Sequence, residues 1–251
     1  TANGIARKLE KKGWISDYRL MSIYGRILGY NDKLQAGTYF VGPEDTKKTL
    51  LERIVKGSVA TFSATFIEGS TVIDFIKVLR NAPHVQSTLS DPPGFRLMEE
   101  LGLPEHHPEG LFFPSTYIYR VGETDRRIMK RAYRRMEKQL RLSWNNASEN
   151  LPYKKPYEAL IMASIIEKET GLHAERDKIA GVFVRRLRSK MRLQSDPTVI
   201  YGLGESFTGN ITRADLRKDT PYNTYTRFGL PPTPIAAVGE AALNAALNPK
   251  S

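Results

Sequence analysis

The 251-residue chain contains no cysteine, which excludes disulfide bonds, thiolate metal ligands and a cysteine nucleophile. Long hydrophobic runs are also lacking. The longest apolar stretch, residues 159–166, is far shorter than the roughly 20 residues that a membrane-spanning helix needs. The four histidines do not suggest a metal site: His106 and His107 are adjacent and point apart, while His84 and His173 are isolated. We therefore expect neither a metal nor another cofactor.

Nucleotide and hydrolase motifs are missing as well. The chain has no Walker loop and no nucleophile elbow, and Gly202 and Gly204 lack the third glycine of a dinucleotide-binding turn. Positive charge is abundant: 38 Lys and Arg against 27 Asp and Glu give a net charge of +11. Such a surplus attracts an anionic polymer or membrane surface, or merely keeps the surface soluble. No nucleic-acid motif accompanies the charge, so we expect no nucleic-acid partner.

Apolar periodicity predicts an α+β fold. A hydrophobic content of 40% is typical of a globular protein with a real core. The first forty residues read as two helices followed by a strand at 34–41, an order that resembles a LysM module, a small glycan-binding fold, although a structural cap would give the same pattern. Further along the chain we predict helices at 46–55, 72–79 and 124–142, and a strand at 60–67.

We place a domain boundary near residue 105, where the composition becomes richer in aromatic residues and basic helices. The predicted N-terminal region, residues 1–105, contains the LysM-like subdomain at about 1–60 and a connecting α/β segment. The predicted second domain is larger and covers residues 106–251. The chain begins at Thr1 and not at methionine, so we expect that a signal was removed or that an upstream segment exists.

The strongest local signal is a buried helix that ends in a glutamate. Pro156 and Gly171 bracket about four helical turns, and the middle of this stretch is apolar on every side. Glu167 follows the apolar run directly. Apolar neighbours and the negative end of the helix dipole would both raise the pKa of Glu167 and keep a proton available for general acid catalysis. From the residues alone, a solvated glutamate paired with Lys168 or a nearby arginine is the commoner arrangement.

A conventional pair of catalytic carboxylates is not present on this helix. Glu167 and Glu169 are two residues apart, so their side chains point about 200° away from each other. A second carboxylate must therefore come from another part of the chain, and Asp196 is the nearest candidate in the sequence.

The segment Ala163–Thr170, which reads ASIIEKET, resembles the signature of the MltG/YceG family of endolytic murein transglycosylases. Other segments that resemble the family pattern occur in the expected order, and together they span some 140 residues: EGLFFPSTY at 109–117, LQSDPTVIYG at 193–202, PYNTYTRFGLPPTPI at 221–235 and AALNP at 245–249. The N-terminal unit also fits the LysM-like region of this family. The resemblance therefore covers nearly the whole chain.

The resemblance implies that Glu167 is the catalytic residue of a lytic transglycosylase, a lyase that cuts peptidoglycan glycan strands internally. It implies cleavage of the MurNAc–GlcNAc β-1,4 bond without water, because the C6 hydroxyl of the sugar closes onto C1 as a 1,6-anhydro ring. Since the nucleophile belongs to the substrate, one carboxyl group suffices, unlike in hydrolases that need two. The expected biological role is the termination of nascent strands, and the family region over 106–251 is the catalytic domain.

Further polar and aromatic residues of these motifs are predicted to bind the substrate. Gln194, Ser195 and Asp196 could hydrogen-bond sugar hydroxyls or orient Glu167, although Asp196 before a proline also fits a helix N-terminus. Asn223 and Tyr225 lie in a turn-rich stretch that could present them to a sugar or pack as a loop. Tyr117 is the last predicted sugar contact, although an aromatic residue of this kind more often belongs to a protein core.

The family resemblance also implies a location and partners. Its members are single-pass proteins of the bacterial inner membrane, with the catalytic part in the periplasm, so a membrane anchor preceding this chain and cell-wall synthesis enzymes as partners are expected. The basic helix at 124–142 could face anionic lipid or peptide stems, or simply be solvated. The alternative function is a non-catalytic protein that binds peptidoglycan as a scaffold.

Overall fold

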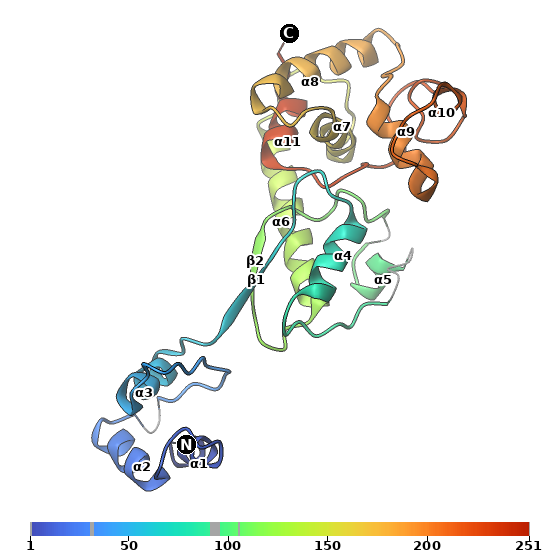
Figure 1. The fold of residues 1–251 in the computed structure, drawn as a ribbon. Coiled ribbons are helices and arrows are strands. Elements are labelled where there is room, and N and C mark those ends of the chain that lie inside the picture. Colours follow the sequence, from blue (N-terminus) through green and yellow to red (C-terminus); the bar gives the residue numbers. More distant parts are fainter. Residues whose placement is uncertain (1, 31–32, 91–95, 105, 251) are drawn as a thin grey trace. The chain divides into compact units, whose positions relative to one another are not determined.

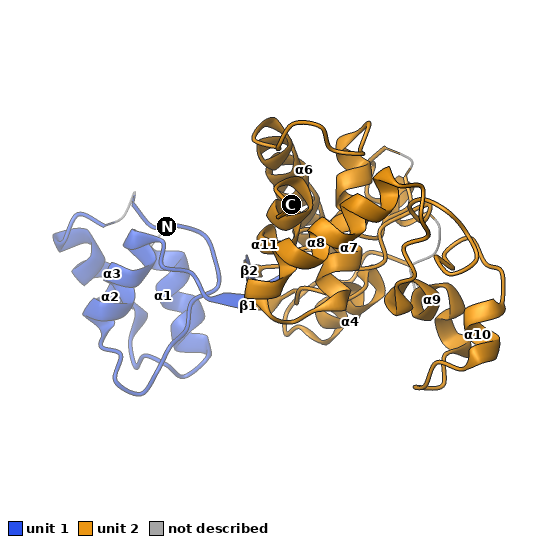
Figure 2. Cartoon of the chain, turned by 90° about the horizontal axis from the view of Figure 1, so that it is seen from above, with its two compact units in different colours: residues 1–62, 118–122 blue, residues 63–117, 123–251 orange. Residues whose placement is uncertain are grey.

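The computed structural model describes the chain except for residues 1, 31–32, 91–95, 105 and 251. Its elements are helices and one two-stranded sheet (Figure 1), which confirms the predicted α+β class. The chain forms two compact units, coloured separately in Figure 2: unit 1 contains residues 1–62 and 118–122, and unit 2 contains residues 63–117 and 123–251. Within the described residues, no helix is both long enough and apolar enough to cross a membrane.

Unit 1 is built from three ten-residue helices, α1 (Ala2–Lys11), α2 (Tyr18–Ile27) and α3 (Lys47–Lys56). Apolar side chains at helical spacing meet in its core, including Ala6 and Leu9 of α1 with Met21 of α2. All three helices fall where the sequence predicts them.

The strand predicted at 34–41 is wrong, because that segment has no regular secondary structure. Its backbone bonds are scattered: the Gln35 N–H donates to Ile54 O at the end of α3, and the Ala60 N–H donates to Thr38 O. A strand needs a continuous ladder of such bonds with a partner strand. The LysM-like interpretation of this unit is accordingly not confirmed.

The sheet pairs β1 (Thr61–Thr65) with β2 (Thr116–Arg120). The hydroxyls of Thr65 and Thr116 are 3.0 Å apart, and the Phe62 and Tyr119 rings stack at 5.9 Å, so the strands run antiparallel. β1 confirms the strand predicted at 60–67. The sequence suggests a domain boundary near residue 105, which lies outside the described residues. The two compact units divide within strands β1 and β2, between residues 62 and 63 and between residues 117 and 118. Residues 63–104 therefore belong with unit 2.

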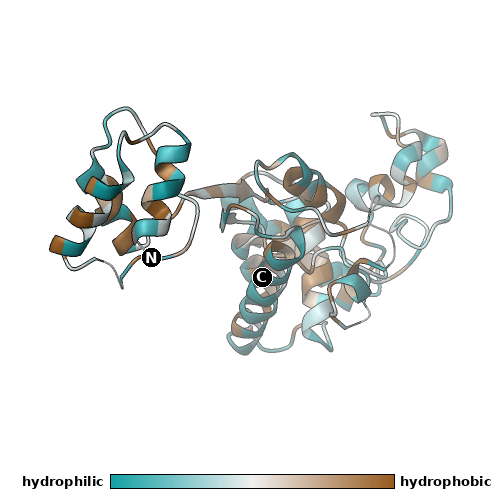
Figure 3. Ribbon diagram, turned by 90° about the horizontal axis from the view of Figure 1, so that it is seen from below, coloured by the Kyte–Doolittle hydropathy of each residue, from teal (hydrophilic) through white to brown (hydrophobic). Residues whose placement is uncertain are grey.

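Unit 2 is built around one apolar helix, α7 (Pro156–Glu169). Helix α7 contacts α6, α8, α9 and α11, which surround it in Figure 1. Figure 3 shows hydrophobic and hydrophilic positions side by side along the surrounding helices, as expected of helices with one buried face. The other helical elements of unit 2 are α4 (Val72–Asn81), α5 (Leu97–Glu100), α6 (Asp125–Asn145), α8 (His173–Arg188), α9 (Asp196–Leu203), the short 3-10 helix η1 (Gly204–Ser206), α10 (Arg213–Arg217) and α11 (Glu240–Leu247).

Candidate active site

Glu167 lies in the last turn of α7, at the end of an uninterrupted buried stretch. Every residue from Ala159 to Glu167 is buried, which confirms the prediction of a helix that is apolar on all sides. The Glu167 side chain is 3% exposed. A carboxyl group in such a place loses most of its hydration, so its charged form is disfavoured.

An irregular segment, residues 235–239, runs along the face of α7 that carries Glu167. Its first N–H, at Ile235, donates to Ser164 Oγ at 3.0 Å, and its last, at Gly239, donates to Glu167 Oε2 at 2.9 Å. Ser164 and Glu167 are three residues apart and share one helix face. The segment thus presents a backbone donor directly to the glutamate.

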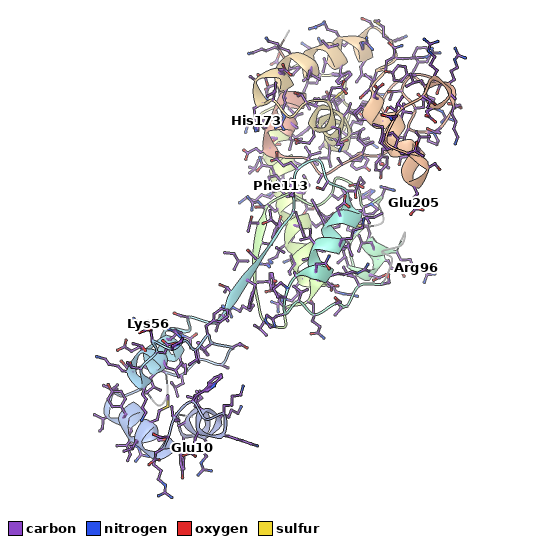
Figure 4. The ribbon with its side chains drawn as sticks, viewed as in Figure 1. Glu10, Lys56, Arg96, Phe113, His173 and Glu205 are labelled. Atoms are coloured by element: carbon purple, nitrogen blue, oxygen red, sulfur yellow. The ribbon has the colours of Figure 1, made fainter. Side chains whose placement is uncertain are left out.

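The second oxygen of Glu167 is held by an arginine from α8. Arg176 Nη2 donates to Glu167 Oε1 at 2.7 Å, and the Arg176 side chain is 5% exposed. Arg176 Nη1 lies 3.1 Å from Nδ1 of His173, the first residue of α8, labelled in Figure 4. Among the described residues, Arg176 Nε is buried without a hydrogen-bond partner.

These surroundings act on the Glu167 pKa in opposite directions. Burial raises the pKa and is the largest effect, whereas the Gly239 N–H and the Arg176 charge lower it. The net result is a pKa above the ordinary value for glutamate. A carboxyl group whose protonated and ionised forms are both stabilised by their surroundings can give up a proton and take it back, as acid–base catalysis requires.

The neighbouring charged residues point elsewhere. Lys168 Nζ donates to Gly69 O at 3.2 Å, while Glu169 Oε2 accepts from Ser195 Oγ at 3.0 Å. Glu167 and Glu169 therefore diverge as their spacing predicts. Glu167 is paired with an arginine, as in the solvated alternative, but the pair is buried.

Four of the predicted substrate-binding residues gather at the start of α9. The Gln194 N–H donates to Thr224 O at 3.1 Å, and Gln194 Oε1 accepts from Arg186 at 3.2 Å. Asp196 Oδ1 accepts from the Tyr225 hydroxyl. Because Ser195 also contacts Glu169 on α7, this cluster is joined to the helix that carries Glu167. The members of the cluster are Gln194, Ser195, Asp196 and Tyr225.

Asn223 and Tyr117 are placed differently. Asn223 is fully buried, and its amide donates to the carbonyls of Asp215, Leu216 and Lys218 at the end of α10. The Tyr117 hydroxyl donates to Phe113 O at 2.7 Å, and its ring packs on Phe66. Both side chains are engaged within the protein core in this structure.

Comparison with known proteins shows the family of the chain. A family model described as the YceG-like family matches residues 1–251. The chain belongs to the YceG-like family. Curated relatives named endolytic murein transglycosylase include one from Bacillus subtilis, 29% identical over 99% of this chain and 73% of that protein. Another, from Streptococcus pneumoniae, is 27% identical over 97% of this chain, which spans half of the relative's length. The crystal structure of a putative YceG-like protein from Listeria monocytogenes covers all of this chain and 88% of that chain, with a TM-score of 0.63 and 28% identity.

Three residues around Glu167 have no recognisable signal in the sequence: Arg176, Gly239 and Glu68. Glu68 Oε2 lies 4.0 Å from Arg176 Nη2, which places a second carboxylate near Glu167, whereas Asp196 accepts a hydrogen bond from Tyr225. Arg176 lies in a helix with many basic residues, and nothing in the local pattern separates it from the exposed ones. Gly239 directly precedes α11, and a glycine at that position is common as a helix N-cap, so the sequence does not mark it as part of a site.

Proposed function

We propose that this chain is an endolytic lytic transglycosylase that cuts peptidoglycan glycan strands with Glu167 as its single acid and base. The observation that carries the proposal is the buried Glu167 carboxyl group, whose pKa is raised by burial while two donors hold its oxygens. The curated relatives named endolytic murein transglycosylase support the same substrate class.

In the proposed reaction, protonated Glu167 gives its proton to the bridging oxygen as the C1–O bond of the MurNAc residue breaks. The Gly239 N–H and Arg176 then stabilise the carboxylate that remains. This carboxylate takes the proton of the C6 hydroxyl while O6 bonds to C1. The proton count balances and water is not consumed.

The test is the digestion of long glycan strands by the protein and by its Glu167→Gln variant, followed by mass analysis of the fragments. We expect 1,6-anhydro ends from the protein and at least a hundredfold slower release from the variant, since general acid–base catalysis contributes about 10²–10⁴-fold. Glu240→Gln removes an exposed carboxylate next to Gly239 and serves as the matched control, with release unchanged.

Other outcomes would reject the proposal in different ways. Fragments with reducing ends would indicate a hydrolase. Binding to the strands without any release would favour the scaffold function, and full activity of Glu167→Gln would remove Glu167 from its role.

The finer roles follow from the same proposal. The substrate lies outside the cytoplasm, so we place the activity on the outer side of the inner membrane, where cutting nascent strands would end their elongation beside the synthesis enzymes. The cluster of Gln194, Ser195, Asp196 and Tyr225 would hydrogen-bond sugar hydroxyls, and Asn223, which accepts the Tyr225 N–H, would support the loop that carries Tyr225. Tyr117 would serve the site only through the core that it packs in. Unit 1 would add glycan affinity as a LysM-like unit.

A further inference from the structure

One guanidinium group in this site faces two carboxylates of very different exposure. Arg176 Nη2 is 2.7 Å from Glu167 Oε1 and 4.0 Å from Glu68 Oε2. The Glu167 side chain is 3% exposed and that of Glu68 is 44% exposed. Arg176 thus lies between a buried carboxyl group and one that is partly exposed to solvent.

The turn that carries Glu68 is fixed by bonds to the same segment that contacts Glu167. The Gly69 N–H donates to Ala237 O at 2.9 Å, and the Ala237 N–H donates to Ser70 O at 2.8 Å. Lys168 Nζ adds a bond to Gly69 O from α7. These contacts fix the backbone from which the Glu68 side chain extends toward Arg176.

Gly239 provides the space for the Glu68 carboxylate. A Cβ atom added at Gly239 would lie 2.1 Å from Glu68 Oε1 and 2.3 Å from its Cδ. The backbone of Gly239, with φ of −78° and ψ of 167°, is one that any residue can adopt. The glycine is needed here for room and not for its conformation.

We propose that Glu68 is a positioning residue for Glu167: by partly neutralising Arg176, it keeps the proton on Glu167 until a glycan strand accepts it. This role rests on the proposed acid–base function. Arg176 favours the ionised form of Glu167, which cannot protonate a leaving oxygen, and so works against the effect of burial. Glu68 acts in the same direction as burial, because it weakens the effect of Arg176 from the exposed side of the guanidinium.

The charges around Glu167 support this role. Arg176 and His173 of α8 lower the pKa of Glu167, whereas the nearby Glu68 carboxylate raises it. Lys168 of α7 bonds to Gly69 O, on the turn that carries Glu68. The same repulsion acts in the second half of the reaction, because a second negative charge nearby makes ionised Glu167 a stronger base toward the C6 hydroxyl.

The experiment is a carbon-13 NMR titration of the Glu167 carboxyl group in the full chain, assigned by the signal lost in Glu167→Gln. A charge within about 4–6 Å of a carboxyl group shifts its pKa by about 1–3 units, and the exposure of Glu68 puts its effect at the low end. We expect Glu68→Gln to lower the Glu167 pKa by about one unit. Gly239→Ala should lower it in the same direction, because the new methyl group displaces Glu68 while the N–H donor remains.

Glu240→Gln is the matched control, since it removes an exposed carboxylate one residue from Gly239, and its Glu167 titration should not change. The alkaline limb of the pH profile of strand cleavage should move with the titration, by about one unit toward acid in Glu68→Gln. A purely structural role for Glu68 would change the stability but leave both midpoints in place.

An unchanged Glu167 titration in Glu68→Gln overturns the proposal, whatever Gly239→Ala does. Because the titration needs no activity, it separates this proposal from the proposed function. A protein that releases no anhydro fragments refutes the function, while active protein with unshifted midpoints refutes only the role of Glu68. If Gly239→Ala does not fold, Glu68→Gln still decides.

Discussion

Glu109 should make the folded protein less stable as the pH rises through neutrality. Its side chain connects two helices of unit 2: Oε1 accepts the Val72 N–H at the start of α4 at 3.1 Å, and Oε2 accepts the Tyr201 hydroxyl of α9 at 3.4 Å. The residue is 3% exposed. Burial raises the pKa of Glu109 from 4.5 to about 7, against the opposing effect of these hydrogen bonds.

The magnitude follows from linkage between ionisation and folding. A group whose pKa is raised on folding contributes stability that is complete below its unfolded pKa of 4.5 and is lost as the pH passes its folded pKa of about 7. Each unit of pKa difference corresponds to about 1.4 kcal/mol, so the full loss is about 3 kcal/mol. Between about pH 5 and about pH 8, most of this loss should be seen.

Glu109→Gln isolates the effect, because glutamine mimics the protonated carboxyl group: its oxygen can accept the Val72 N–H and its amide N–H can donate to the Tyr201 oxygen. Urea unfolding should give similar stabilities for the two proteins at about pH 5, and a variant more stable by about 2–3 kcal/mol at about pH 8. Glu205→Gln, on the surface (labelled in Figure 4), should show no such divergence. If the protein and Glu109→Gln lose stability in parallel over this range, Glu109 ionises normally inside the fold and the reasoning from burial is refuted.

Three more substitutions test contacts around the site. Arg176→Gln should raise the pKa of Glu167 in the carboxyl titration, opposite to Glu68→Gln, and destabilise the fold by about 3–5 kcal/mol in urea unfolding, the cost of breaking a buried ion pair. Ser164→Ala should cost about 1–3 kcal/mol by the same measurement, because the buried Ile235 N–H loses its acceptor. Gly110→Ala should lower the melting temperature, since its φ is +76° and a Cβ would lie 2.5 Å from Pro234 Cβ.

The helices of this protein could be predicted well because their signals are local. Helix α3 starts with a capping box at Thr46 and ends at Gly57 in the left-handed conformation, both readable from the sequence. The burial of Glu167 follows from the apolar run that precedes it. The segment 34–41 was mispredicted because its aromatic and β-branched residues fit a strand, whereas only a neighbouring strand can make one.

The partners of Glu167 could not be predicted because they depend on the tertiary structure. Glu68 is separated from Glu167 by the chain that forms α4, α5, β2 and α6, and no spacing rule links the two. Arg176 is nine residues from Glu167, but the helix break between α7 and α8 removes any periodic relation. A buried arginine among exposed ones on a basic helix has no signal in a single sequence.

The segment 235–239 contributes to the site through its backbone N–H groups. It has no helix or strand, yet Ile235, Ala237 and Gly239 donate their N–H groups to α7, to the Glu68 turn and to Glu167 in turn. Every residue except proline keeps such donors, so most other substitutions here should act through packing. Gly239 differs, because a side chain at that position would occupy the place of the Glu68 carboxylate. The absence of a Cβ atom at Gly239 leaves room for the Glu68 carboxylate and, through it, helps to set the proton affinity of Glu167.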